Sequence, residues 1–302
     1  MAINDACLCG TGMNNTGVVN CVKLFKKTTG MFIVPLIAND GTRNSLDLST
    51  AINMDAKVKH LDPSKRWYPV TDLKDVELPT AESRFETAKD GSKFKLADGI
   101  KSFKGVIYEA GSMFASKLQG VSCEKYGVVL FDIDGNVRGI KDGTNLYPVE
   151  VGGWDAIFND ASDDSVSKIM IQFDFDILLK VSRFWILSSA DLGVNPNTLS
   201  GLVDANITVG AITSTSVSIS VNSDYGSGIS TVMTSPIVGL VATDFSLTRT
   251  DTNADIPVVT ATETADGVYT LTYTAITGST VPLKVKVLPL SGFEGYAKYI
   301  DA

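Results

Sequence analysis

In the stretch Ser216-Val217-Ser218-Ile219-Ser220-Val221, polar and apolar residues alternate strictly. A period of two places Val217, Ile219 and Val221 on one face of a β-strand, so we expect this face to be buried. The same alternation returns in residues 268–273, directly after the turn Asp266-Gly267. Further strand-like runs lie at 205–209, 246–248, 258–260 and 281–287. This spacing of strands and turns predicts an all-β sandwich in the C-terminal third of the chain.

A long β-hairpin is the main feature that we predict for the N-terminal part. Two charged, strand-like stretches, 76–88 and 94–109, flank the turn Lys89-Asp90-Gly91-Ser92. Asp-Gly is a strong hairpin signal. We expect this hairpin to project from a β-sandwich-like body.

Shorter patterns complete the predicted N-terminal body. Strands are expected at 18–25, 30–37 and 168–177, and a hairpin is expected at 128–140. Ser112 as a cap and Gly120 as a terminator bracket one short helix. The predicted fold is therefore mainly β, with a long hairpin and one short helix in the N-terminal body.

A change in composition divides the chain near residue 195. Residues 190–197 contain the Gly, Pro and Asn cluster that is typical of a linker. Only four Lys or Arg residues follow residue 200, so the preceding part holds 22 of the 26. We therefore predict an assembly domain at 1–195 and a β-sandwich domain at 196–302.

Charge and composition argue against nucleic-acid binding, most enzyme classes and a membrane segment. The formal net charge is −8, so no diffuse basic field is available to hold nucleic acid. His60 is the single histidine, and histidine is the usual residue for proton transfer near neutral pH. No apolar run approaches the roughly 20 residues that span a bilayer. We expect a protein that is not an enzyme, uses no cofactor or metal, and has no membrane segment.

Three motifs resemble chemical sites only in part. Asp132-x-Asp134-x-Asn136 begins like a calcium loop, but Val137 and Gly143 occupy the positions that need glycine and glutamate, so a hairpin turn is favoured. Cys7, Cys9 and Cys21 lack the spacing of a metal site. The serine in 226–228 is not part of the G-x-S-x-G motif that surrounds a nucleophilic serine. With Cys123, all four cysteines precede the predicted sandwich, which suits a reducing cytoplasm.

The C-terminal third resembles bacterial and phage immunoglobulin-like domains. The resemblance rests on residues 239–247 and on the later run 266–272, and it covers about 203–288. It implies an immunoglobulin-like β-sandwich, although the cysteine pair of antibody domains is missing. The aromatic residues of 292–300 are expected to lie outside this sandwich.

The N-terminal part is similar in element order to tail-tube-like phage proteins. The whole chain also looks like virion proteins of crAss-like phages, on residues 89–91 and 131–136. These resemblances imply a ring-forming tail subunit that builds part of a DNA conduit in a virion assembled in the host cytoplasm. They also imply that the hairpin at 76–109 is the contact between subunits. Its candidate assembly residues are Phe85, Lys89, Asp90, Gly91, Phe94 and Phe103. Implied partners are further copies of the chain, other virion proteins and a host surface glycan. The alternatives are a head fibre or capsid-decoration protein, and a carbohydrate-binding adhesin module.

Overall fold

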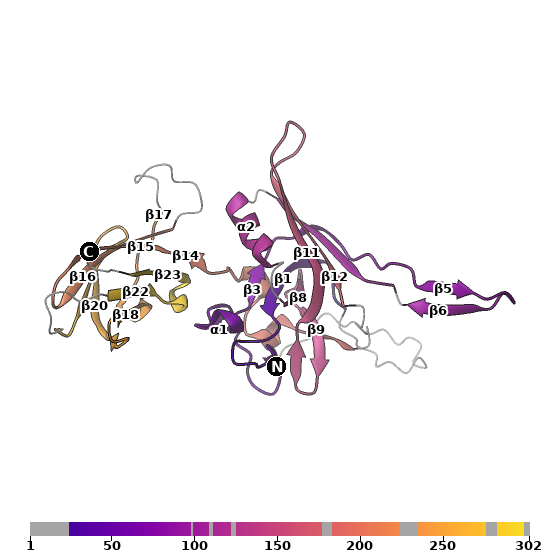
Figure 1. The fold of residues 1–302 in the computed structure, drawn as a ribbon, viewed down its shortest axis with the longest axis horizontal. Helices are drawn as coiled ribbons and strands as arrows, with labels where there is room; N and C mark the ends of the chain where they lie inside the picture. Colours follow the sequence, from indigo (N-terminus) through magenta and orange to yellow (C-terminus); the bar gives the residue numbers. More distant parts are fainter. Residues whose placement is uncertain are drawn as a thin grey trace. The chain divides into compact units, whose positions relative to one another are not determined.

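The computed structural model describes residues 24–97, 99–108, 111–121, 125–176, 183–223, 235–275 and 283–298. Strands dominate these residues, so the prediction of a mainly β protein is confirmed. The chain divides into two compact units (Figure 1). The first contains the described residues up to Val58 and from Ser64 to Ser200; the second contains Lys59–Pro63 and the chain from Gly201 onward.

One large antiparallel sheet organises the first unit. Its strand order is β2 (Leu46–Asp47), β10 (Asn145–Tyr147), β9 (Val137–Asp142), β8 (Tyr126–Asp132), β11 (Val149–Asn159), β12 (Lys168–Phe175), β7 (Ser102–Tyr108) and β4 (Lys74–Glu77). Off this path, β1 (Thr28–Pro35) pairs with β8 and with β3 (Tyr68–Val70), and β13 (Phe184–Leu187) pairs with β9.

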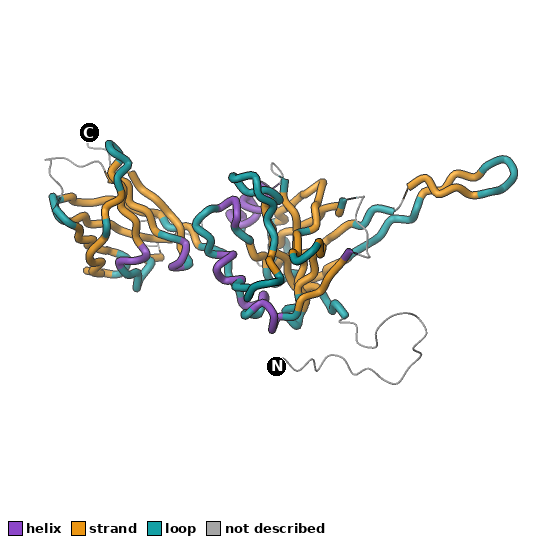
Figure 2. The backbone as a smooth tube through the Cα atoms, turned by 90° about the horizontal axis from the view of Figure 1, so that it is seen from below, coloured by secondary structure: helices purple, strands orange, loops and turns teal. Residues whose placement is uncertain are grey.

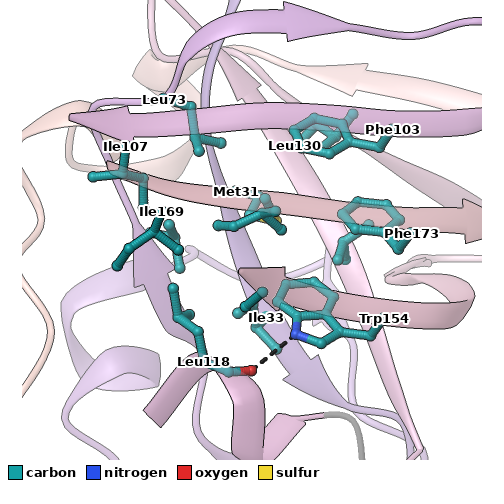
Figure 3. Packing of buried hydrophobic residues seen from close by; sticks show 14 of the residues in the cluster. Met31, Ile33, Leu73, Phe103, Ile107, Leu118, Leu130, Trp154, Ile169 and Phe173 are labelled. Carbon is teal, nitrogen blue, oxygen red and sulfur yellow. Dashed lines mark hydrogen bonds between the residues drawn. The ribbon is translucent and has the colours of Figure 1, made fainter. Parts of the chain in front are cut away.

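The main core of this unit lies between β1 and β8 on one side and β7 and β12 on the other (Figure 3). Met31 and Leu130 come from the first pair of strands, and Phe103 and Phe173 come from the second. Helix α2 (Ser112–Gly120) adds Leu118, whose carbonyl accepts a hydrogen bond from Trp154 Nε1 at 2.9 Å. Strand β11 pairs with β8 at its start and with β12 along the rest of its length, so the single sheet forms both layers. The body is thus β-sandwich-like, as the sequence predicts.

A second core covers the other face of β1 and β8. Phe32 and Phe131 pack there with Trp67 and with Met54 of helix α1 (Met54–Val58). The prediction of a single helix is therefore incomplete. Helix α1 has five residues and buries only its two ends, which is too short for a 3.6-residue period to show in the sequence.

Several predicted elements of the first unit are confirmed. The hairpin at 128–140 is β8–β9, and β12 buries Ile169, Ile171, Phe173 and Phe175 in the predicted alternation. Helix α2 lies where it was expected, but its N-cap is Gly111 and Ser112 is already helical. Of the strand predicted at 18–25, residues 24 and 25 are not in a strand, and the rest lies outside the described residues.

The predicted linker at 190–197 is part of the first unit. Leu192 and Pro196 are buried in the short 3-10 helices η4 (Ser189–Leu192) and η5 (Pro196–Thr198). Asn197 accepts a hydrogen bond from Thr29 Oγ1 at 2.6 Å and donates one to the carbonyl of Asp132 at 2.9 Å. The division between the units lies after Ser200.

The second unit is a sandwich of two sheets. One has the order β15 (Asn206–Ile212), β16 (Ser216–Ser223), β21 (Val268–Tyr273) and β20 (Val258–Ala265), and β17 (Ser235–Pro236) pairs with β16. The other has the order β14 (Val203–Asp204), β23 (Phe293–Lys298), β22 (Leu283–Val287), β18 (Phe245–Arg249) and β19 (Asp255–Ile256). Apart from the added β14, β17 and β19, the two orders are those of the ABED and GFC sheets of the immunoglobulin fold.

The core of this sandwich contains the predicted residues. Val217, Ile219 and Val221 are buried together with Leu247 and Val285 of the opposite sheet. The expectation for residues 292–300 is wrong in its described part, because β23 pairs antiparallel with β22 and parallel with β14. Gly295 permits this pairing, since a Cβ atom there would lie 1.9 Å from the carbonyl oxygen of Ala205. The stretch lacks regular alternation, so periodicity did not predict it.

Candidate assembly surface

The predicted long hairpin is present and forms an arm, residues 74–108. At its base β4 pairs with β7, and at its far end β5 (Arg84–Thr87) pairs with β6 (Lys93–Ala97). Between these pairs, Ser102 N donates to the carbonyl of Pro79 and Ala81 N to that of Ile100, each at 2.9 Å. Figure 2 shows the arm extending away from the body of the first unit.

The tip of the arm is a tight turn built by Asp90 and Gly91. Asp90 Oδ1 accepts hydrogen bonds from Ser92 N at 2.9 Å and Ser92 Oγ at 2.6 Å. These bonds hold the pKa of the Asp90 carboxyl below its usual value. Gly91 has a φ of +83°, which only glycine adopts without cost. Asp90 and Gly91 therefore shape the turn, and Lys89 beside them is exposed.

The base of the arm holds two aspartates in the left-handed region. Asp72 has a φ of 61° and Asp75 a φ of 47°. Lys74 Nζ forms an ion pair with Asp72 Oδ1 at 2.6 Å. Tyr108 OH donates to Asp75 Oδ2, and this hydrogen bond raises the pKa of Tyr108. Aspartate is among the non-glycine residues that tolerate this conformation best. Sequence analysis missed them, because nothing in the sequence around Asp72 or within β4 around Asp75 marks a left-handed residue.

The far end of the arm has no core of its own. All four residues of β5 are exposed. Phe85, Phe94 and Leu96 are 57%, 60% and 60% exposed. Single exposed apolar residues are normal on protein surfaces, but three large ones on one short hairpin form a candidate contact surface.

Phe103 does not belong to this surface, so its inclusion in the predicted contact set is wrong. It is fully buried, and its ring stacks on that of Phe173 with centroids 4.7 Å apart and planes inclined by 6°. The alternation in β7 turns Phe103 toward the main core, where no neighbouring molecule reaches it. The remaining candidates, Phe85, Lys89, Asp90, Gly91 and Phe94, lie on β5, β6 and their turn.

The aspartates at 132–136 form a hairpin turn. Asp132 is fully buried; its Oδ1 accepts from Asp134 N at 3.0 Å and Asn136 N at 2.9 Å, and its Oδ2 accepts from Lys26 N at 3.0 Å. Asn136 Nδ2 also donates to both oxygens. Backbone and amide N–H groups thus occupy the carboxylate that a calcium loop would offer to the ion.

The other motifs form no chemical site among the residues that the structure describes. His60 Nδ1 accepts a hydrogen bond from Asp62 N at 3.0 Å. Within the described parts of the chain, no three His, Cys, Asp or Glu side chains are grouped so that they could hold a metal ion. The four cysteines and residues 226–228 lie outside the described residues. Neither helix in the described ranges is long and apolar enough to span a membrane.

Comparisons with known proteins add no identification. Neither the models of known protein families nor the curated proteins contain a match to this chain.

Proposed function

We propose that this protein is a structural subunit of a bacteriophage virion that forms rings in the tail and builds part of the DNA conduit. The arm is the contact between neighbouring copies. The observation that carries this proposal is the far end of the arm, where a two-stranded hairpin has no core and exposes Phe85, Phe94 and Leu96.

The energetics of the hairpin favour such a contact. An isolated two-stranded hairpin is at best marginally stable in water, so β5 and β6 gain stability from a partner that covers them. They form a two-stranded sheet of their own, and a strand of a neighbouring copy can extend such a sheet at its edge. The arm leaves one part of the body and binds a different surface of the next copy, which makes the contact heterologous. Such contacts close into a ring when the rotation between copies permits.

Two further observations support the phage assignment. The order of a β-sandwich body, a long hairpin, a helix and an appended immunoglobulin-like unit resembles that of tail-tube-like phage proteins. The net charge of −8 suits the wall of a conduit, because DNA would be repelled by it rather than held.

The immunoglobulin-like unit is assigned a binding role toward other virion proteins or a host surface glycan. Ser218, Ser220, Thr270 and Thr272 point away from its core on the paired strands β16 and β21. The hydroxyl groups on this face carry no charge and can both donate and accept hydrogen bonds. They can therefore pair with the hydroxyl groups of a glycan. Binding of the full chain to a glycan on an array would support a host surface glycan as the partner of this unit. If the chain binds no glycan on the array, other virion proteins remain as the proposed partner.

Negative-stain electron microscopy together with the light-scattering mass of the purified full chain tests the proposal. We expect closed rings whose mass is a fixed multiple of 32.2 kDa. Dimers or trimers would instead favour a head fibre or capsid-decoration protein. A monomer at all concentrations would overturn the assembly role.

A further inference from the structure

We propose that the β5–β6 hairpin is covered on both of its faces in the assembly, inserted between surfaces of neighbouring copies of this chain. This inference rests on the proposed function and specifies the contact. It excludes an arm that lies flat on one surface with its other face in water.

The register of the hairpin places an aromatic side chain on each face. Phe85 is the partner of Lys95, and Glu86 is the partner of Phe94. Directly opposed residues share a face, and successive residues along a strand point to opposite faces. Phe85 and Phe94 therefore lie on opposite faces, and both are more than half exposed.

A hairpin that binds one surface needs only one apolar face. In such a strand pair, apolar residues alternate with polar residues that stay in water. Here the apolar surface is divided between the two faces, and Leu96, at the register shift of β6, extends it further. Cover from one side would leave either Phe85 or Phe94 in water.

Charge identifies the occupant as a second copy of the chain. Residues 84–97 contain four Lys or Arg and two Asp or Glu, which gives this hairpin a net charge of +2. The whole chain carries −8, so the remainder carries −10. A positive hairpin on an otherwise acidic chain is attracted to further copies of that chain.

Two single substitutions in the full chain test the two faces separately. Phe85→Ser and Phe94→Ser each remove one exposed aromatic side chain. We expect each to weaken self-association by about tenfold or more in sedimentation velocity, as loss of a central aromatic contact does. Ile133→Ser is the matched control, because Ile133 is 58% exposed on the turn between β8 and β9. Urea unfolding of all three variants shows that the body remains folded.

The outcomes separate this inference from the proposed function. If only one of the two substitutions weakens self-association, the arm lies on a single surface and the two-faced insertion is wrong. If neither substitution weakens self-association, the arm is not the interface, and the proposed function loses its main support.

A photo-crosslinking side chain placed at Glu86 or at Thr87 gives an independent readout. These residues are neighbours on β5, so their side chains point to the faces of Phe94 and Phe85 respectively. We expect cross-links to two different peptides of a second copy. Cross-links to one shared peptide, or only to nucleic acid in a lysate, would overturn the inference.

Discussion

Asp132 is a buried carboxylate that joins three segments of the first unit. It binds the backbone of Lys26, the turn after β8 and, through its own carbonyl, the side chain of Asn197. Asp132→Ala leaves the N–H donors of Lys26, Asp134 and Asn136 without their carboxylate acceptor, although the carbonyl that binds Asn197 remains. This should lower the free energy of unfolding by about 3 kcal/mol. Asp134→Ala is the control, because it removes an ion pair with Lys26 that is exposed to solvent and therefore adds little stability. Equal losses in urea unfolding would contradict this assignment.

Glu263 makes the second unit sensitive to acid. Its carboxylate accepts hydrogen bonds from Gly239 N and Gly267 N, each at 3.0 Å, and these lower its pKa from the usual 4.5. Because the folded pKa lies below the unfolded one, this stabilisation is present above the unfolded pKa and is lost as the pH falls through the folded pKa.

The pH dependence of Glu263→Gln checks that sign. We expect this variant to melt at a lower temperature than the natural chain near neutral pH, where the carboxylate is the better acceptor. The difference should shrink in acid below the folded pKa, where the natural chain is protonated too. Calorimetry at the two pH values measures both differences, and an unchanged gap would count against the role of the carboxylate.

At the scale of elements, the arm depends on a close approach of its two strands. A Cβ atom on Gly99 would lie 1.6 Å from the carbonyl oxygen of Ala81. Gly99→Ala therefore forces the strands apart, and we expect it to abolish assembly while the urea midpoint of the body stays the same. Gly152→Ala on β11 is the control, since a Cβ atom there meets nothing within 4 Å. Normal assembly of Gly99→Ala would show that the spacing of the arm is unimportant.

The elements that could be predicted from the sequence differ physically from those that could not. Period-two alternation and Asp-Gly turns predicted β16, β21 and the arm, because these elements bury one face or turn sharply. Phe103 was misplaced because alternation tells which residues share a face but not which face is buried. Helix α1 and strand β23 were missed because one is too short and the other lacks alternation.

At the scale of the whole molecule, the two units have their own cores, whereas the far end of the arm has none. Folding of the units does not require the far end of the arm to be buried. The proposed contact with further copies instead accounts for its apolar side chains and positive charge. The central claim is therefore that β5 and β6 become buried when the chain assembles.

Amide hydrogen exchange of the full chain, compared between assembled and monomeric fractions, tests this claim most directly. Backbone amides that become buried and hydrogen-bonded exchange slowly. We predict that peptides covering Arg84–Thr87 and Lys93–Ala97 exchange slowly in the assembled fraction and rapidly in the monomer. Equal exchange of these peptides in both fractions would contradict the account.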